Sequence, residues 1–339
     1  MNTYVWNRLL IIGSAFILSA TSWAGTPATV YNPAEDPALE EVVPHGVTPD
    51  PAQRAAVLHA VPYTYLTKAE YDEQGNVIGI YLSNHKAKSN CKAVFEKYGE
   101  NERPGVTAEV VADFAVFTEL RDLEMLQQDP SPEGFEAAQN WSKLKSFRIE
   151  HMDDPGFMLY VNALPTVKWL ELKHLFGTDG TYVDQIGTLP NLKRLELDND
   201  SAQQEALVFL QRNPSIEDFE LHRSDLSNEE IGQLVDYLPN LKRLALKPGR
   251  AKEHFNHESL AHVKRLNQLQ VFGFHHWSDD MFVWENGIEH LASIPSLEFV
   301  EAPSGGRGKP TPAAIIKLLE VRPDVQIADG KAVVITEEE

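Results

Sequence analysis

The sequence predicts an α/β solenoid of about nine repeats, with a curved parallel sheet on the concave side and helices on the convex side. Three observations predict it: an apolar phrase recurs at a fixed period, each phrase ends with alternating apolar and exposed positions, and the connecting segments have helical spacing. One such unit cannot bury both its strand face and its helix face, so neighbouring units must stack.

The phrase is clearest in four copies, at 164–172, 189–197, 213–221 and 238–246. They end at Leu172, Leu197, Leu221 and Leu246, so the steps between them are 25, 24 and 25 residues. The apolar-x-apolar ending predicts a short strand with two inward apolar side chains and an outward residue between them. Weaker copies end at Met125, Ile149, Phe274 and Ala302, and a first strand is expected at 77–82.

The segments between the strands favour helices. In 226–238, Ile231, Leu234, Val235 and Leu238 have helical spacing. Ser227 and Glu230 form a capping box pattern ahead of that run. Each unit is therefore expected to be strand, turn and helix.

These repeats resemble the leucine-rich repeat superfamily. The resemblance covers most of the chain and implies that the inner surface of the solenoid is the contact surface. It also implies recognition of a protein or peptide, and it does not name the partner.

The ends of the chain predict export. Residues 1–24 hold Arg8, a short apolar run and Ser22-Trp-Ala24, which is the layout of a cleavable signal peptide. Residues 25–62, rich in proline and acids at first, are expected to be an unstructured leader, 63–335 the repeat domain with hairpin caps, and 336–339 an acidic tail. The single cysteine, Cys91, rules out an intramolecular disulfide and favours a bacterial protein that is periplasmic or secreted.

The charge limits the class of partner. A formal net charge of −20 disfavours nucleic acid and anionic membrane surfaces, and favours a basic or mixed-charge partner. No segment after the signal peptide reaches the length of a membrane span, so stable membrane insertion is not expected.

The outward residues of the strands provide the candidate site. Parallel strands lie about 4.8 Å apart, so Glu171, Glu196 and Glu220 should form an acidic row on the concave face, flanked by cations that include Lys173. The alternative is a charged sheet face that is balanced internally. The candidate contact residues are Arg148, Trp169, Glu171, Arg194, Glu196, Glu220 and Arg243.

A second group of residues could form a rim beside this face: His275, His276, Trp277 and Trp284. His275 and His276 match no metal-ligand spacing, so a metal site there is the weaker alternative to contact or packing. The sequence shows no convincing catalytic motif and implies no cofactor. The expected function is that of an exported, non-enzymatic scaffold that recognises a protein or peptide, with a structural cell-envelope protein as the alternative.

Overall fold

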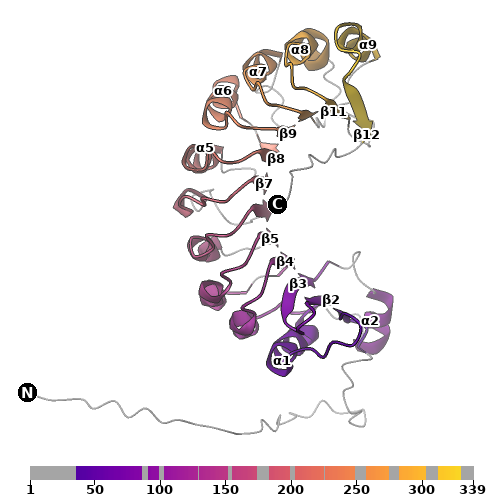
Figure 1. Cartoon of the computed structure of the whole chain (residues 1–339), viewed down its shortest axis with the longest axis vertical. Coiled ribbons are helices and arrows are strands. Elements are labelled where there is room, and N and C mark those ends of the chain that lie inside the picture. The colour runs from indigo at the N-terminus through magenta and orange to yellow at the C-terminus, as the bar shows by residue number, and fades with distance from the viewer. Residues whose placement is uncertain are drawn as a thin grey trace, which may run out of the picture.

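The computed structural model describes residues 36–85, 91–98, 103–128, 130–151, 155–173, 183–198, 203–224, 226–248, 257–274, 282–302 and 312–329. Within these ranges, the strands form one 12-stranded sheet in the order of the sequence, β1 to β12. Figure 1 shows the strands along the inner side of an arc and the helices along its outer side. The predicted α/β, solenoid-like architecture is confirmed.

The strands of the sheet run parallel, except for one antiparallel pair near the N-terminal end. The register joins Tyr81, Glu124, Arg148, Glu171, Glu196 and Glu220 in one row, as the alignment of the phrases predicts. The repeated strands are β3 (Val77–Ser83), β4 (Asp122–Leu126), β5 (Ser146–Glu150), β6 (Trp169–Lys173), β7 (Arg194–Asp198), β8 (Asp218–Ser224), β9 (Arg243–Pro248), β10 (Val271–Phe274) and β11 (Phe299–Ala302).

The N-terminal end of the sheet differs from the sequence expectation. Residues 36–62, assigned above to an unstructured leader, form β1 (Leu39–Val42), α1 (Pro51–Ala60) and most of the short helix η2 (Val61–Tyr63). β1 pairs in parallel with β2 (Leu66–Tyr71), which pairs antiparallel with β3 where a hairpin is expected. Proline misled the composition argument, because Pro51 occupies the first turn of α1, where proline is well tolerated.

The helices on the convex side change along the chain. The connections between β3 and β7 combine 3₁₀ segments of three to nine residues with α-helices of four to eight residues, and the later connections use α-helices of seven to eleven residues. The capping box of Ser227 and Glu230 is present ahead of α6. The remaining helical elements are α2 (Cys91–Tyr98), α3 (Ala108–Asp113), η3 (Phe114–Val116), η4 (Pro132–Asn140), η5 (Pro155–Phe157), α4 (Met158–Val161), η6 (Val183–Gln185), α5 (Gln203–Arg212), α6 (Asn228–Tyr237), α7 (His257–Val263), α8 (Phe282–Ala292) and α9 (Pro312–Val321).

A continuous apolar core fills the space between the sheet and the helices. The inward strand residues Leu170, Leu195, Phe219 and Leu244 are fully buried in it. Trp141 joins two adjacent repeats, because its indole nitrogen donates a hydrogen bond to the Phe114 carbonyl at 3.0 Å. The helices thus cover one face of the sheet and leave its other face for the charged side chains.

At the C-terminal end, β12 (Gln326–Asp329) continues the sheet in parallel with β11. The end of the predicted repeat domain with its hairpin cap, at 330–335, lies outside the described residues, as do the predicted signal peptide at 1–24 and the predicted acidic tail at 336–339. No helix in the described ranges has both the length and the apolar character that a membrane crossing requires.

Candidate functional site

Three parallel rows of side chains cover the concave face of the middle strands. The central row is the one predicted from the phrases, and a second row lies two residues earlier in each strand and holds Trp169, Arg194, Asp218 and Arg243. A third row lies two residues later and holds Lys173, Asp198, His222 and Lys247. Because the central row carries glutamates and the two outer rows carry most of the cations, ion pairs can form along and across the strands.

Arg243 is the centre of the C-terminal half of this face, and it is only 1% exposed. Its Nη1 donates to Asp218 at 2.8 Å and its Nη2 to Glu220 at 2.9 Å. Its Nε and Nη2 also donate to the two carboxylate oxygens of Glu301, at 2.9 and 3.1 Å. One guanidinium therefore links β8, β9 and β11.

The interaction of Arg243 with Glu301 passes over β10, so the residues of β10 beneath it must be small. Ala245 and Gly273 stand in the central row between Glu220 and Glu301. A Cβ atom on Gly273 would lie 2.3 Å from Glu301 Oε2 and 3.2 Å from the Ala245 Cβ. Glycine at this position is what allows the Glu301 carboxylate to lie over β10 and reach Arg243.

The surroundings of Arg243 keep its charge in place. Burial lowers the pKa of Arg243, but the hydrogen bonds that it donates to Glu301 and the charges of Asp218, Glu301 and Glu220 raise it by more. The net pKa is well above the ordinary arginine value, so the guanidinium stays protonated. A buried charge of this kind is tolerated because it is paired with carboxylates and all three of its nitrogens donate hydrogen bonds.

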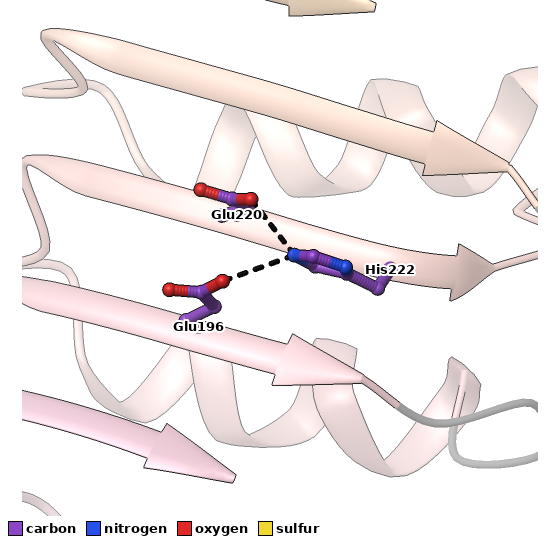
Figure 2. Close-up of side chains that lie close together, drawn as sticks. All are labelled: Glu196, Glu220 and His222. Carbon is purple, nitrogen blue, oxygen red and sulfur yellow. Dashed lines mark hydrogen bonds and ion pairs between the residues drawn. The ribbon is translucent and has the colours of Figure 1, made fainter. Parts of the chain in front are cut away.

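His222 occupies the centre of a second cluster, with Glu196 and Glu220. Figure 2 shows its Nε2 pointing between the two carboxylates, 3.0 Å from Glu196 Oε1 and 2.8 Å from Glu220 Oε1. Burial lowers the pKa of His222, but these two hydrogen bonds raise it by more, and the net pKa is raised. Glu196 and Glu220 therefore favour the protonated imidazole.

The same three residues have the composition of a metal site, with ligand atoms that all lie within 4.8 Å of one another. Two lysines already bind these atoms, however. Lys173 Nζ lies 2.7 Å from Glu196 Oε1, and Lys247 Nζ lies 2.5 Å from Glu220 Oε1 and 3.1 Å from His222 Nε2. A metal ion would have to displace both ammonium groups, so the arrangement fits a set of ion pairs better than a metal centre.

The N-terminal half of the concave face is organised around Trp169. The guanidinium carbons of Arg148 and Arg194 lie 4.6 and 4.1 Å from its ring, so the indole is stacked between two cations. Arg148 also lies 6.0 Å from the Tyr81 ring and is paired with Glu124. Such aromatic and arginine stacks are common at the centres of protein interfaces.

This half also contains buried polar side-chain atoms that lack a hydrogen-bond partner in the described ranges. Ser146 Oγ, Arg148 Nε and Trp169 Nε1 have no hydrogen-bond partner within the described structure. Buried donors are normally satisfied by protein, water or a ligand. The unsatisfied donors gather where the stacked residues are still partly exposed.

The structure divides the predicted contact residues into two groups. Arg148, Trp169, Glu171 and Arg194 are partly exposed, whereas Glu196, Glu220 and Arg243 are 2%, 1% and 1% exposed. His275, His276 and Trp277 lie outside the described residues, as does the side chain of Trp284 in α8.

Three members of the network were not among the predicted residues: Asp218, His222 and Lys247. A count of two residues to each side of the central outward position would have found them, because alternate residues of a strand share a face.

Comparison with known proteins does not assign a family. No protein-family model matches the chain, and no curated protein sequence matches it. The function must therefore be inferred from the residues of the concave face.

Proposed function

We propose that the protein is a non-enzymatic recognition module of the leucine-rich repeat type, exported to the periplasm or the medium. It binds a protein or peptide of mixed charge through the N-terminal half of its concave face. The contact residues are Tyr81, Arg148, Trp169, Glu171 and Arg194. The C-terminal half, with the Arg243 network, supports this surface.

The observation that carries the proposal is the stack of Arg148, Trp169 and Arg194 with its unused donors. Tryptophan and arginine contribute most strongly where a partner excludes water from them. Carbonyl or carboxylate oxygens of a partner would accept from donors such as Trp169 Nε1 once the side chains shift to admit it. Glu171 beside the two arginines favours a partner that presents both charges.

The buried half is poorly suited to direct contact. Arg243 is paired with Glu220, Glu196 is paired with Lys173, and all three of Glu196, Glu220 and Arg243 expose almost no surface. Charge reversal at these positions would disrupt the sheet as well as any binding, so it cannot test recognition. Variants of the partly exposed stack can test it.

The experiment is a pull-down from the envelope fraction and the culture fluid of the source organism. It compares the wild type with Trp169→Ala and with Leu159→Ser, a control whose side chain is 55% exposed on the convex helix α4. We expect a partner that the wild type and Leu159→Ser retain and Trp169→Ala loses, with all three melting temperatures within a few degrees. Equal retention by all three would overturn the proposed site, and bulk co-fractionation with envelope material would favour a structural protein.

A further inference from the structure

A groove runs along the edge of the sheet where β4, β5 and β6 begin. Its volume is about 570 Å³, and it is lined by Arg121, Ser142, Lys143, Lys145, Thr166, Lys168 and Asn191. No acidic residue belongs to this lining, although the chain carries a formal net charge of −20. A strongly acidic protein thus has a groove lined by cations and neutral polar groups.

The cations are aligned by the backbone of the repeat. Arg121, Lys145 and Lys168 each directly precede a strand, and the Lys145 and Lys168 amides donate to the carbonyls of Arg121 and Lys145 at 2.7 and 2.8 Å. This bonding puts successive side chains about one strand spacing apart, roughly 4.8 Å. Three positive charges therefore follow one another along the edge.

The side chains of these three residues make no ion pair in the described part of the chain. Lys143, in the same groove, is paired with Glu119 at 2.5 Å. The next lysines along this edge, Lys193 and Lys242, are both paired with Glu217, at 2.6 and 2.8 Å. Asp122 interacts electrostatically with Arg121 and Lys145, and Asp72 with Arg121, but neither acid forms an ion pair with them in the described ranges. The cations of the β4 to β6 edge are thus less fully neutralised than Lys193 and Lys242 at the same repeat position.

The neutral wall of the groove is fixed by bonds between adjacent turns. Thr166 Oγ1 donates to the carbonyls of Ser142 and Leu144 at 3.1 and 2.8 Å. Asn191 Nδ2 donates to the Pro165 carbonyl at 2.8 Å. The groove is therefore built on a stable frame, and a ligand would meet cations already arranged in a row.

We propose that this groove binds a ligand that carries several phosphate groups in a short row. Lysine is a good point charge for phosphate, and consecutive phosphates can each meet one cation. The negative field of the whole protein repels anions, but at physiological salt it is screened over about 8 Å. A short oligophosphate stays within the local positive field, whereas a long polyanion would extend over acidic surface.

The proposal does not rest on the proposed function, because none of the groove residues belongs to the concave contact surface. Phosphate groups in a row could be free in solution or presented at a lipid surface. The experiment therefore has two arms: titration with inorganic tripolyphosphate, and sedimentation with phosphatidylcholine vesicles that contain phosphatidic acid.

The variants are Lys145→Ala/Lys168→Ala and a matched control, Lys193→Ala/Lys242→Ala, which removes two lysines from the same repeat position. We expect the first to weaken binding at least about tenfold and the control to change it by less than about threefold. Binding should also fall as salt rises. Loss in the tripolyphosphate arm assigns a free ligand, and loss in the vesicle arm alone assigns a lipid source.

Two results would overturn the proposal. One is that the wild type binds in neither arm. The other is that both double variants lose binding equally, since that would reflect general charge and not this groove.

Discussion

Arg243 joins three carboxylates, of which Glu220 and Glu301 have almost no access to water and Asp218 is 13% exposed. Arg243→Met would leave Glu220 and Glu301 buried without this cation, at a cost of about 3–5 kcal/mol in the free energy of unfolding. Arg243→Lys keeps the positive charge but loses the planar set of guanidinium donors. Its free energy of unfolding should therefore lie between those of the wild type and Arg243→Met. Urea unfolding measures both.

The control for this prediction is Lys242→Met, the neighbouring residue, whose partly exposed pair with Glu217 should contribute less than about 1 kcal/mol. Equal losses from the two methionine variants would show that the buried network is not the main support of the sheet.

His222 gives the concave face a dependence on pH. Its folded-state pKa is raised above the unfolded value of about 6.5, so its contribution is complete below that pH and is lost as pH rises through the folded pKa. The groups around it are Lys173, Glu196, Asp198, Glu220 and Lys247.

We therefore expect the wild type to lose more stability than His222→Asn as pH rises from neutral to mildly alkaline. Urea midpoints across this range measure the difference, and His257→Asn, which changes an exposed residue of α7 away from the network, is the control. Parallel profiles for the wild type and His222→Asn would contradict the assignment.

At the scale of single residues, the sequence predicted the outward row but not its burial. The spacing of the phrases gives the register, and the register gives the row of Glu171, Glu196 and Glu220. Whether such a row is accessible to a partner depends on whether long side chains from other strands cover it. Glu301 of β11 reaches Arg243 of β9 across β10, and no local sequence pattern predicts that contact.

Among the elements, β10 has glycine at the position over which Glu301 reaches Arg243. Gly273→Ala would put a methyl group 2.3 Å from Glu301 Oε2, and the strain should cost about 1–3 kcal/mol. In a Glu301→Ala background the same change should cost less than about 1 kcal/mol, because the clashing carboxylate is gone. Urea unfolding of the four proteins tests this, and additive costs would show that Gly273 has another role.

The first strand depends on one carboxylate. Glu41 of β1 accepts from Arg54 of α1 at 3.0 to 3.3 Å and from the Tyr71 hydroxyl of β2 at 2.7 Å. Glu41→Ala would leave that hydroxyl without its acceptor, and we expect a loss of about 1–3 kcal/mol in thermal or urea unfolding. Glu40→Ala, at the exposed neighbouring position, should stay within about 0.5 kcal/mol. Equal effects would mean that Glu41 does not anchor β1.

The N-terminal elements also show where composition misled the prediction. The prolines and acids of 25–62 predicted an unstructured segment. In the structure, however, Asp50 caps α1 and Pro51 is its first residue. The apolar residues Val57 and Ala60 then pack against the core. A local cap-and-proline signal should outweigh average composition when the two disagree.

At the scale of the whole molecule, the solenoid presents two regions with different uses of charge. In the C-terminal half, buried charges form ion pairs with one another. In the N-terminal half, Trp169 lies between two arginines and is partly exposed. The repeat period predicted the α/β solenoid because stacking is the one way such units bury their faces. The partner could not be predicted, since a repeat fixes the shape of a surface and not its ligand.

The most direct test puts a photoreactive amino acid at Tyr81, beside the Arg148 and Trp169 stack, and in a second protein at Leu159 on the convex side. Both are irradiated in cells of the source organism, and the adducts are identified by mass spectrometry. We predict a discrete protein adduct from position 81 that position 159 does not form, and that disappears when Trp169→Ala is added. Adducts from position 159 alone, or the same adducts from both positions, would contradict recognition through the concave face.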